Sequence, residues 1–156
     1  MNYTAKEIIF SWEDVDNLIA KISKELKNRL SASSAQNYEI IAIAKGGIIP
    51  ATLLSYKLKI KAINIFPIID KKVISHKIPI LDTTKDYLLV DEIYDTGKTI
   101  GLVEQYLTSV NYVKIFLLQR YTIDSSSNHL HGRILNDPRW VVFPWEDQTT
   151  QQDKVI

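Results

Sequence analysis

The feature that most constrains the fold is an alternation of short apolar runs with segments of helical spacing. The apolar runs cover residues 38–44, 60–66, 87–90 and 112–118. Helices are predicted over 48–58 and 99–110, and a capping box from Ser11 to Asp14 starts an earlier one. Alternating strands and helices predict the α/β class, with a central, mostly parallel sheet flanked by helices.

Two polar segments interrupt this pattern. Residues 67–86 have weak periodicity and are predicted as a long loop or an irregular hairpin. Residues 125–139 are predicted as a turn-rich connection, with His129 and His131 on the surface, before the short apolar run 140–143.

Composition bounds the class of protein. The 156 residues suit a single domain, and 46% hydrophobic with 24% charged residues is typical of a soluble globular chain. A net charge of +1 offers no field for nucleic acid or an anionic membrane, and zero cysteines exclude disulfides and thiolate sites. No stretch resembles a signal peptide or a membrane span, so a cytoplasmic location is expected.

Two loops follow predicted strands and open predicted helices, at residues 45–47 and 91–99. Both are expected at the same edge of the sheet, where ligands of parallel sheets bind. The run Asp95 to Thr99 has the composition of a phosphate site, because Gly97 permits a tight turn and hydroxyls and helix N–H groups donate to an anion. A P-loop nucleotide hydrolase is disfavoured, since Glu92 stands where that motif needs glycine.

The adjacent acids Asp91 and Glu92 need a partner other than phosphate. Paired carboxylates can accept hydrogen bonds from vicinal sugar hydroxyls, directly or through a hydrated Mg²⁺. A solvated turn is the alternative interpretation of either acid alone. The order of acids and phosphate loop matches a ribose that carries a 5′-phosphate.

The stretch "LLVDEIYDTGKT" resembles the 5-phosphoribosyl-1-pyrophosphate (PRPP) motif of the type I phosphoribosyltransferases, especially the hypoxanthine-guanine enzymes. The resemblance implies that Asp91 and Glu92 hold the ribose and Mg²⁺, the metal in part through water. It implies a 5′-phosphate site made of Asp95, Thr96, Gly97, Lys98 and Thr99. It also gives Asp95 a catalytic role as the acid that bonds purine N7 and assists removal of a proton.

Two further stretches are similar to segments of the xanthine-guanine enzymes. "IIAIAKGGIIPATLLSYKL" resembles the pyrophosphate loop, which implies that Lys45, Gly46 and Gly47 bind pyrophosphate and that the peptide bond before Lys45 is cis. "DPRWVVFPWED" resembles the purine-binding segment, in a small C-terminal hood over about 121–148 beside a core over about 7–120.

The resemblance assigns purine contacts to Arg120, Trp140, Val141 and Glu146. Trp140 would stack on the base, the Val141 backbone would meet the base edge, and Trp145 with Glu146 would support the pocket floor. Arg120 stands where the family has a lysine that donates to purine O6. Core packing remains open for both tryptophans, and a surface position for Arg120.

The expected function is purine salvage: a 6-oxopurine and PRPP give a nucleoside 5′-monophosphate and pyrophosphate, with Mg²⁺ as cofactor. Small molecules rather than nucleic acid are the expected partners, in a homodimer or homotetramer by analogy. Residues 67–86 lack the Ser-Tyr pair of the family's closing loop. The alternatives are a PRPP-sensing or RNA-binding regulator of the same fold, or a transferase for another base.

Overall fold

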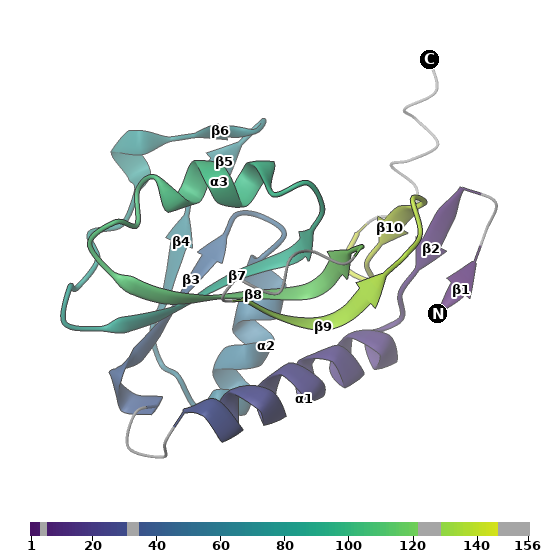
Figure 1. The fold of residues 1–156 in the computed structure, drawn as a ribbon, viewed down its shortest axis with the longest axis horizontal. Helices are drawn as coiled ribbons and strands as arrows, with labels where there is room; N and C mark the ends of the chain where they lie inside the picture. Colours follow the sequence, from purple (N-terminus) through teal and green to yellow (C-terminus); the bar gives the residue numbers. More distant parts are fainter. Residues whose placement is uncertain (4–5, 31–34, 122–128, 147–156) are drawn as a thin grey trace.

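The computed structural model describes residues 1–3, 6–30, 35–121 and 129–146 (Figure 1). The helices are α1 (Trp12–Arg29), α2 (Ile48–Leu58) and α3 (Lys98–Glu104), with short 3₁₀ turns at Ala35–Asn37 and Ser75–Lys77. The strands are β1 (Asn2–Tyr3), β2 (Glu7–Ile9), β3 (Tyr38–Ile43), β4 (Ile63–Phe66), β5 (Ile68–Ile69), β6 (Lys72–Val73), β7 (Asp86–Tyr94), β8 (Asn111–Arg120), β9 (His129–Leu135) and β10 (Trp140–Val142). None of the helices in these ranges is long and apolar enough to cross a membrane.

The centre of the molecule is a five-stranded sheet in the order β4-β3-β7-β8-β9. Each neighbouring pair in it is parallel. The inner strands are buried on both faces, as expected for a parallel sheet covered by helices. The predicted α/β fold with a central, mostly parallel sheet is confirmed.

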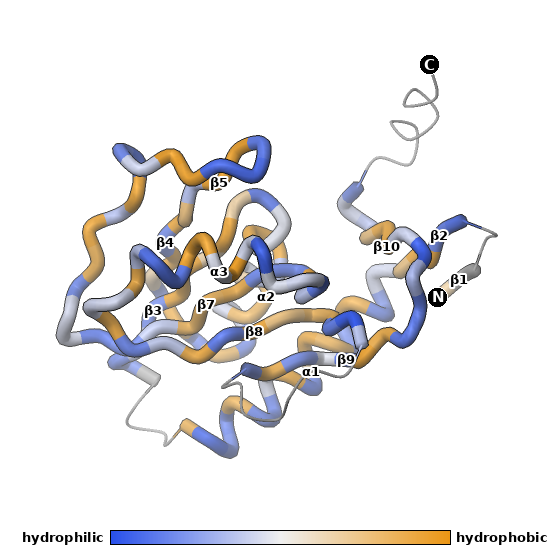
Figure 2. The backbone as a smooth tube through the Cα atoms, turned by 45° about the horizontal axis from the view of Figure 1, so that its top comes forward, coloured by the Kyte–Doolittle hydropathy of each residue, from blue (hydrophilic) through white to orange (hydrophobic). Residues whose placement is uncertain are grey.

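Helices cover both faces of this sheet. Helices α1 and α2 pack on one face, over a core that contains Leu18, Leu54 and Leu88, and α3 covers the other face (Figure 1). On the α3 side, Ile100 and Val103 join a second cluster with Phe66 and Leu89. Figure 2 shows hydrophobic residues concentrated along β7 and β8, whereas α1 alternates hydrophobic and hydrophilic stretches. Packing on both faces therefore fixes the strands of the sheet, and the loops that follow the strands begin at defined positions.

Helix α1 begins as its sequence predicts. The Ser11 hydroxyl accepts a hydrogen bond from the Asp14 backbone N–H at 3.1 Å, and Asp14 accepts from the Ser11 N–H at 2.8 Å. This reciprocal capping box satisfies two N–H groups that the first turn leaves without partners. Beyond it, the residues at helical spacing are buried against the sheet: Val15, Leu18, Ile19, Ile22 and Leu26.

Two predicted boundaries near the phosphate loop are wrong. The third strand was expected to end at Val90, but β7 continues to Tyr94, because it pairs with β8 as far as Tyr94–Gln119. The following helix was expected to reach residue 110, but α3 ends at Glu104 after seven residues. The acids Asp91 and Glu92 therefore lie on a strand rather than in the loop after it.

The prediction for the polar segment is also wrong within 129–135. These residues form β9, which pairs with β8 from Lys114–His129 to Arg120–Leu135. His129 and His131 are half-buried instead of surface residues. The His129 ring stacks on Tyr94, with ring centroids 5.4 Å apart, and its Nε2 lies 2.6 Å from Gln119 Oε1. Residues 125–128 lie outside the described residues.

A second, three-stranded sheet joins the two ends of the chain, in the order β1-β2-β10. Strand β10 pairs with β2 in parallel, from Trp140–Glu7 to Val142–Ile9. The sequence did not predict β1 or β2. Because β9 belongs to the central sheet and β10 pairs with the N-terminal segment, the C-terminal residues are divided between two sheets, and a hood over 121–148 stays a prediction.

The two histidines on β9 predict a pH dependence of stability. Burial lowers the pKa of both imidazoles. Positive charge on His131 and Lys114 lowers the pKa of His129 further. The charge of Lys21 lowers the pKa of His131, whereas the charge of Glu25 acts in the opposite direction. Below an unfolded pKa of about 6.5, the unfolded chain takes up protons that the native state resists. We expect the free energy of unfolding to fall as pH drops from 7 to 5.

Urea denaturation at several pH values checks this expectation. His129→Gln should reduce the slope of unfolding free energy against pH between 7 and 5, whereas His76→Gln, at an exposed position, should leave the slope unchanged. Equal slopes in the wild type and His129→Gln would show that the burial of this ring does not contribute to the pH dependence of the unfolding free energy.

Candidate active site

The site lies where the connections of the sheet change direction. From β3 the chain continues through α2 to β4 on one side, and from β7 it continues through α3 to β8 on the other. In doubly wound sheets of this strand order, ligands bind beyond the carboxyl ends of the two strands at this switch point. The loop 45–47 follows β3 and residues 95–97 follow β7, so both predicted loops lie there.

The two acids project from β7 beyond the end of its neighbour. Pairing of β3 with β7 ends at Ala42–Val90, while β7 continues to pair with β8. Asp91 Oδ1 accepts a hydrogen bond of 2.8 Å from the Glu92 backbone N–H. Asp91 and Glu92 thus lie on a central strand that still pairs with β8 but no longer pairs with β3.

The two loops are in direct contact. A Cβ atom placed on Gly46 would lie 2.6 Å from Glu92 Cδ and 2.8 Å from its Oε1. Only glycine lets the backbone after β3 approach the carboxylate so closely. The Ala44–Lys45 peptide bond is cis, as the resemblance implies. The structure therefore brings together residues 45–47 and 91–99, which the sequence predicts to share one edge.

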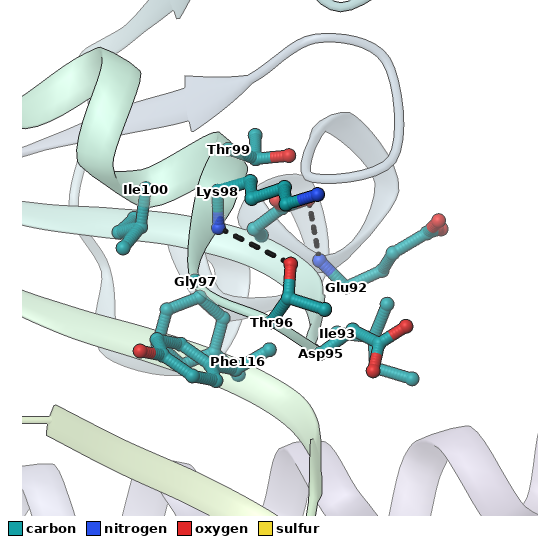
Figure 3. Close-up of a pocket in the computed structure, with 11 residues that line it drawn as sticks. Glu92, Ile93, Asp95, Thr96, Gly97, Lys98, Thr99, Ile100 and Phe116 are labelled. Atoms are coloured by element: carbon teal, nitrogen blue, oxygen red, sulfur yellow. Dashed lines mark hydrogen bonds between the residues drawn. The ribbon is translucent and has the colours of Figure 1, made fainter. Parts of the chain in front are cut away.

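A cavity of about 190 Å³ lies over the loop after β7 (Figure 3). It is lined by residues 91–100 and by Phe116. The Lys98 N–H lies 3.4 Å from the Thr96 hydroxyl, which turns the backbone into α3. Because α3 has only seven residues, its dipole is short, and the N–H groups and hydroxyls of the loop are the main donors for an anion.

Tyr94 packs against Gly97 of this loop, a contact that the sequence did not predict. Its ring packs edge-on against Phe116 at 5.1 Å between centroids. Its hydroxyl lies 2.5 Å from the position of a Cβ on Gly97, whose φ of 79° is left-handed. Glycine is thus required at 97 both for its backbone angle and for space. In the sequence, the one local indication of this contact is that a bulky residue, Tyr94, directly precedes Asp95.

Burial disfavours charge on both acids of β7. It raises the pKa of Asp91 to about 7. For Glu92, burial together with the charges of Asp91 and Glu146 raises the pKa to about 8, against a hydrogen bond from Trp145 and the charge of Lys45. A ligand that brings a cation or several hydroxyl donors would restore the charged forms. The pair therefore suits a polyhydroxyl ligand or a metal ion.

The same pair fits Mg²⁺ better than a protein-enclosed metal. Within the described ranges, no three His, Cys, Asp or Glu side chains gather into a metal cluster. Mg²⁺ keeps much of its water shell and is commonly bound by one or two carboxylates together with substrate phosphates. Asp91 and Glu92 are two adjacent carboxylates and therefore match this kind of ligand set.

Arg120 is buried, so the alternative of a surface arginine is excluded. It is the last residue of β8 and is 9% exposed. Its Nε lies 3.2 Å from Asp95 Oδ1. Its Nη1 donates to the carbonyl of Asp137 and, at 3.2 Å, to that of Arg139. The predicted catalytic acid and a predicted purine ligand are therefore in contact.

Trp140 and Val141 occupy the first two positions of β10. Trp140 is 61% exposed, so packing in the core does not explain it. Its N–H donates to the Lys6 carbonyl, and the Val142 carbonyl accepts from Phe10 N–H. Since alternate residues of a parallel strand bond to opposite sides, the Val141 N–H and C=O point away from β2. Both features agree with the predicted purine contacts, which stay predictions.

Trp145 and Glu146 lie near Glu92 and are both partly buried. The Trp145 ring stacks on Phe143 at 4.7 Å, and its hydrogen bond reaches Glu92. Glu146 Oε2 accepts from the Phe143 N–H at 2.7 Å and closes the turn. Trp145 is thus partly packed in the core, as the alternative interpretation holds, and it also supports the site.

Residues 67–86 include the hairpin of β5 and β6, in agreement with an irregular hairpin. Asp70 and Lys71 both have left-handed φ angles, of 50° and 61°, which is typical of a two-residue hairpin turn. Lys71, Lys72, His76 and Lys77 are exposed. Within the described residues, none of 67–86 lines the cavity, and a closing role stays a prediction.

Comparison with known proteins agrees with this geometry. No family model matches the chain. The xanthine-guanine phosphoribosyltransferase of Idiomarina loihiensis is 23% identical over 155 residues, covering 92% of this chain and 89% of that protein. The crystal structure of the purine phosphoribosyltransferase from Pyrococcus horikoshii Ot3 is 27% identical, with a TM-score of 0.72, and covers 91% of this chain and 95% of its own. The chain resembles the type I phosphoribosyltransferases, and these relatives support enzyme activity of that kind.

A second solved structure supports the same fold for this chain. The xanthine-guanine-hypoxanthine phosphoribosyltransferase of Helicobacter pylori is 18% identical, with a TM-score of 0.69, and covers 94% of this chain and 98% of its own. At this identity the likeness concerns the fold alone. The phosphoribosyltransferase fold therefore extends over nearly all of the chain.

Proposed function

We propose that this phosphoribosyltransferase joins a 6-oxopurine to PRPP and releases a nucleoside 5′-monophosphate and pyrophosphate. The observation that supports the proposal is the close approach of Gly46 to Glu92, since a pyrophosphate loop at 45–47 would then adjoin ribose-binding acids on β7. The phosphate cavity over residues 91–100 continues from the same acids. PRPP carries its two anionic groups at opposite ends of one ribose, so it suits two adjoining anion sites with carboxylates between them.

In the proposed reaction, purine N9 attacks C1 of the ribose while the bond from C1 to pyrophosphate breaks. Asp91 and Glu92 accept hydrogen bonds from the ribose hydroxyls and face a ring that gains positive charge, so they stabilise the transition state more than the substrate. They would also hold a hydrated Mg²⁺, which would neutralise charge on the departing pyrophosphate. Lys45 and the N–H groups of Gly46 and Gly47 bind that leaving group.

The base would sit between β10 and the end of β8. Trp140 would stack on the purine plane, the Val141 backbone would meet its edge, and Arg120 would donate to O6. Glu146 holds the turn that carries Trp145 beneath the site. Asp95 accepts the proton that the base loses as N9 bonds to C1, and it is the catalytic acid–base group.

One assay tests this function. The protein is incubated with PRPP and Mg²⁺ and, separately, guanine, hypoxanthine, xanthine, adenine or uracil, and released pyrophosphate is measured. We expect release with at least one of the 6-oxopurines and none with adenine or uracil. Binding of PRPP without any release would instead indicate a PRPP-sensing regulator, and release with adenine or uracil would assign another base.

The phosphate site yields a more specific expectation. Thr99→Ala should raise the Michaelis constant for PRPP by about tenfold or more, because a hydrogen bond to a charged phosphate is worth about 1.5–3 kcal/mol. The turnover number should change little. Thr52→Ala is the matched control, since the Thr52 hydroxyl donates to the Ile48 carbonyl of its own helix at 2.9 Å. Steady-state kinetics in PRPP check both variants, and an unchanged constant for Thr99→Ala rejects the assignment.

A further inference from the structure

The guanidinium of Arg120 joins three parts of the chain. It stands at the end of β8, lies 3.2 Å from Asp95 at the end of β7 and donates to two carbonyls in the segment 137–139. A buried arginine requires partners for its charge and its donors, and these contacts supply them. The planar group holds its N–H bonds at fixed angles, so the positions of Asp95 and the segment are linked.

The segment 137–139 is held by hydrogen bonds between its own residues. The Asp137 carboxylate accepts from the Arg139 backbone N–H at 2.9 Å, from its Nε at 3.0 Å and from its Nη2 at 2.5 Å. These bonds lower the pKa of Asp137 to about 2, so the clamp is intact at neutral pH. Trp140 follows directly and begins β10. A movement of this segment would therefore move both the proposed purine platform and Arg120.

We propose that Arg120 is a positioning residue, which holds the Asp95 carboxylate in line with the base and couples it to the segment leading into Trp140. The inference rests on the proposed function and extends it. A contact with purine O6 alone would leave the bonds through Nε and Nη1 without a purpose. Lysine, which the resemblance would place here, carries its three donors on one nitrogen and lacks the planar fork that directs Nε to Asp95 and Nη1 to the two carbonyls.

The positioning role predicts that Arg120 acts through Asp95. Arg120→Lys keeps the positive charge but removes the fork, so the turnover number should fall about tenfold or more. If the loss arises from a misplaced Asp95, the same substitution in an Asp95→Asn background should lower turnover by less than about twofold, because residues that act as a unit are not additive. The Michaelis constant for the base should change less than turnover.

The experiment is a double-mutant cycle on turnover, with wild type, Arg120→Lys, Asp95→Asn and the double variant. Thermal melts establish that each protein is folded, and Arg133→Lys, at an exposed position of β9, is the matched control. Asp137→Asn loosens the same segment without changing Arg120 or Asp95. It should lower turnover in the wild-type background only, which keeps the test decisive should Arg120→Lys not fold.

The outcomes separate this inference from the proposed function. Equal loss of turnover in both backgrounds, or a loss confined to the Michaelis constant for the base, would leave Arg120 with a base contact alone and overturn the positioning role. A wild type that releases no pyrophosphate with any base would remove the proposed function and this inference together.

Discussion

Asp95→Asn is expected to lower the turnover number by about 10²–10⁴-fold, the usual contribution of a general acid–base group. The dissociation constant for PRPP should stay within about threefold of the wild type. Asparagine has nearly the same shape and keeps an oxygen for Arg120 Nε, which lies 3.2 Å from Asp95 Oδ1, but it cannot accept the proton of the base. The expected separation of turnover from binding is the signature of a catalytic rather than a binding role.

Single-turnover kinetics and equilibrium titration with PRPP measure the two quantities independently. Asp16→Asn, on the exposed side of α1, is the matched control and should change neither. Equal losses in turnover and PRPP affinity would mean that Asp95 mainly holds the phosphate loop, and the catalytic assignment would then be wrong.

Gly47→Ala is expected to damage both stability and binding of pyrophosphate. A Cβ on Gly47 would collide with the Val90 carbonyl oxygen and would lie 2.8 Å from the Ile43 oxygen and 2.9 Å from its nitrogen. These atoms belong to the two central strands, so they cannot move aside. Overpacking of this kind costs about 1–3 kcal/mol, or roughly 2–12 °C in Tm for a domain of this size.

A second glycine provides the control for this expectation. Gly101 lies in α3, and a Cβ there would meet nothing within 4 Å. Gly101→Ala should raise Tm slightly, because alanine favours a helix by about 1 kcal/mol over glycine. Calorimetric melts of both variants decide the question. A Gly47→Ala protein as stable as the wild type would contradict the close packing of the 45–47 loop on β7.

The parts of the fold that sequence predicts well are those with local signals. Helix α2 covers Ile48–Leu58 as expected, because two glycines precede it and Pro50 lies in its first turn. The capping box of α1 is likewise complete within four residues. The two site loops could be placed at one edge because connections in parallel sheets follow strict rules.

The errors occur where distant residues decide the structure. Strand β9 contains His129, His131 and Gly132, residue types that favour strands weakly, so the segment was interpreted as a loop. The available sequence signal was short: polar residues alternate with apolar or small ones over 129–132, and in the structure these positions are half-buried and buried in turn. Gly132 is needed there because a Cβ would lie 2.7 Å from the Leu117 carbonyl oxygen and 2.9 Å from Leu18 Cδ2, contacts that exist only after folding.

The candidate site shows the same division. The acids and the phosphate loop form one continuous motif, so their proximity follows from sequence. The contacts of Arg120 with Asp95 and with the carbonyl of Asp137 join residues far apart in the chain, and no local pattern indicates them. The length of β7 is set by its pairing with β8, which local apolarity does not reveal.

The central claim is that one edge of the sheet binds both ends of PRPP. Isothermal titration calorimetry with PRPP, in the presence and absence of Mg²⁺, tests it most directly. We expect saturable binding of one PRPP per chain when Mg²⁺ is present, with both ribose 5-phosphate and pyrophosphate displacing it. No binding of PRPP in the presence of Mg²⁺ would contradict the claim.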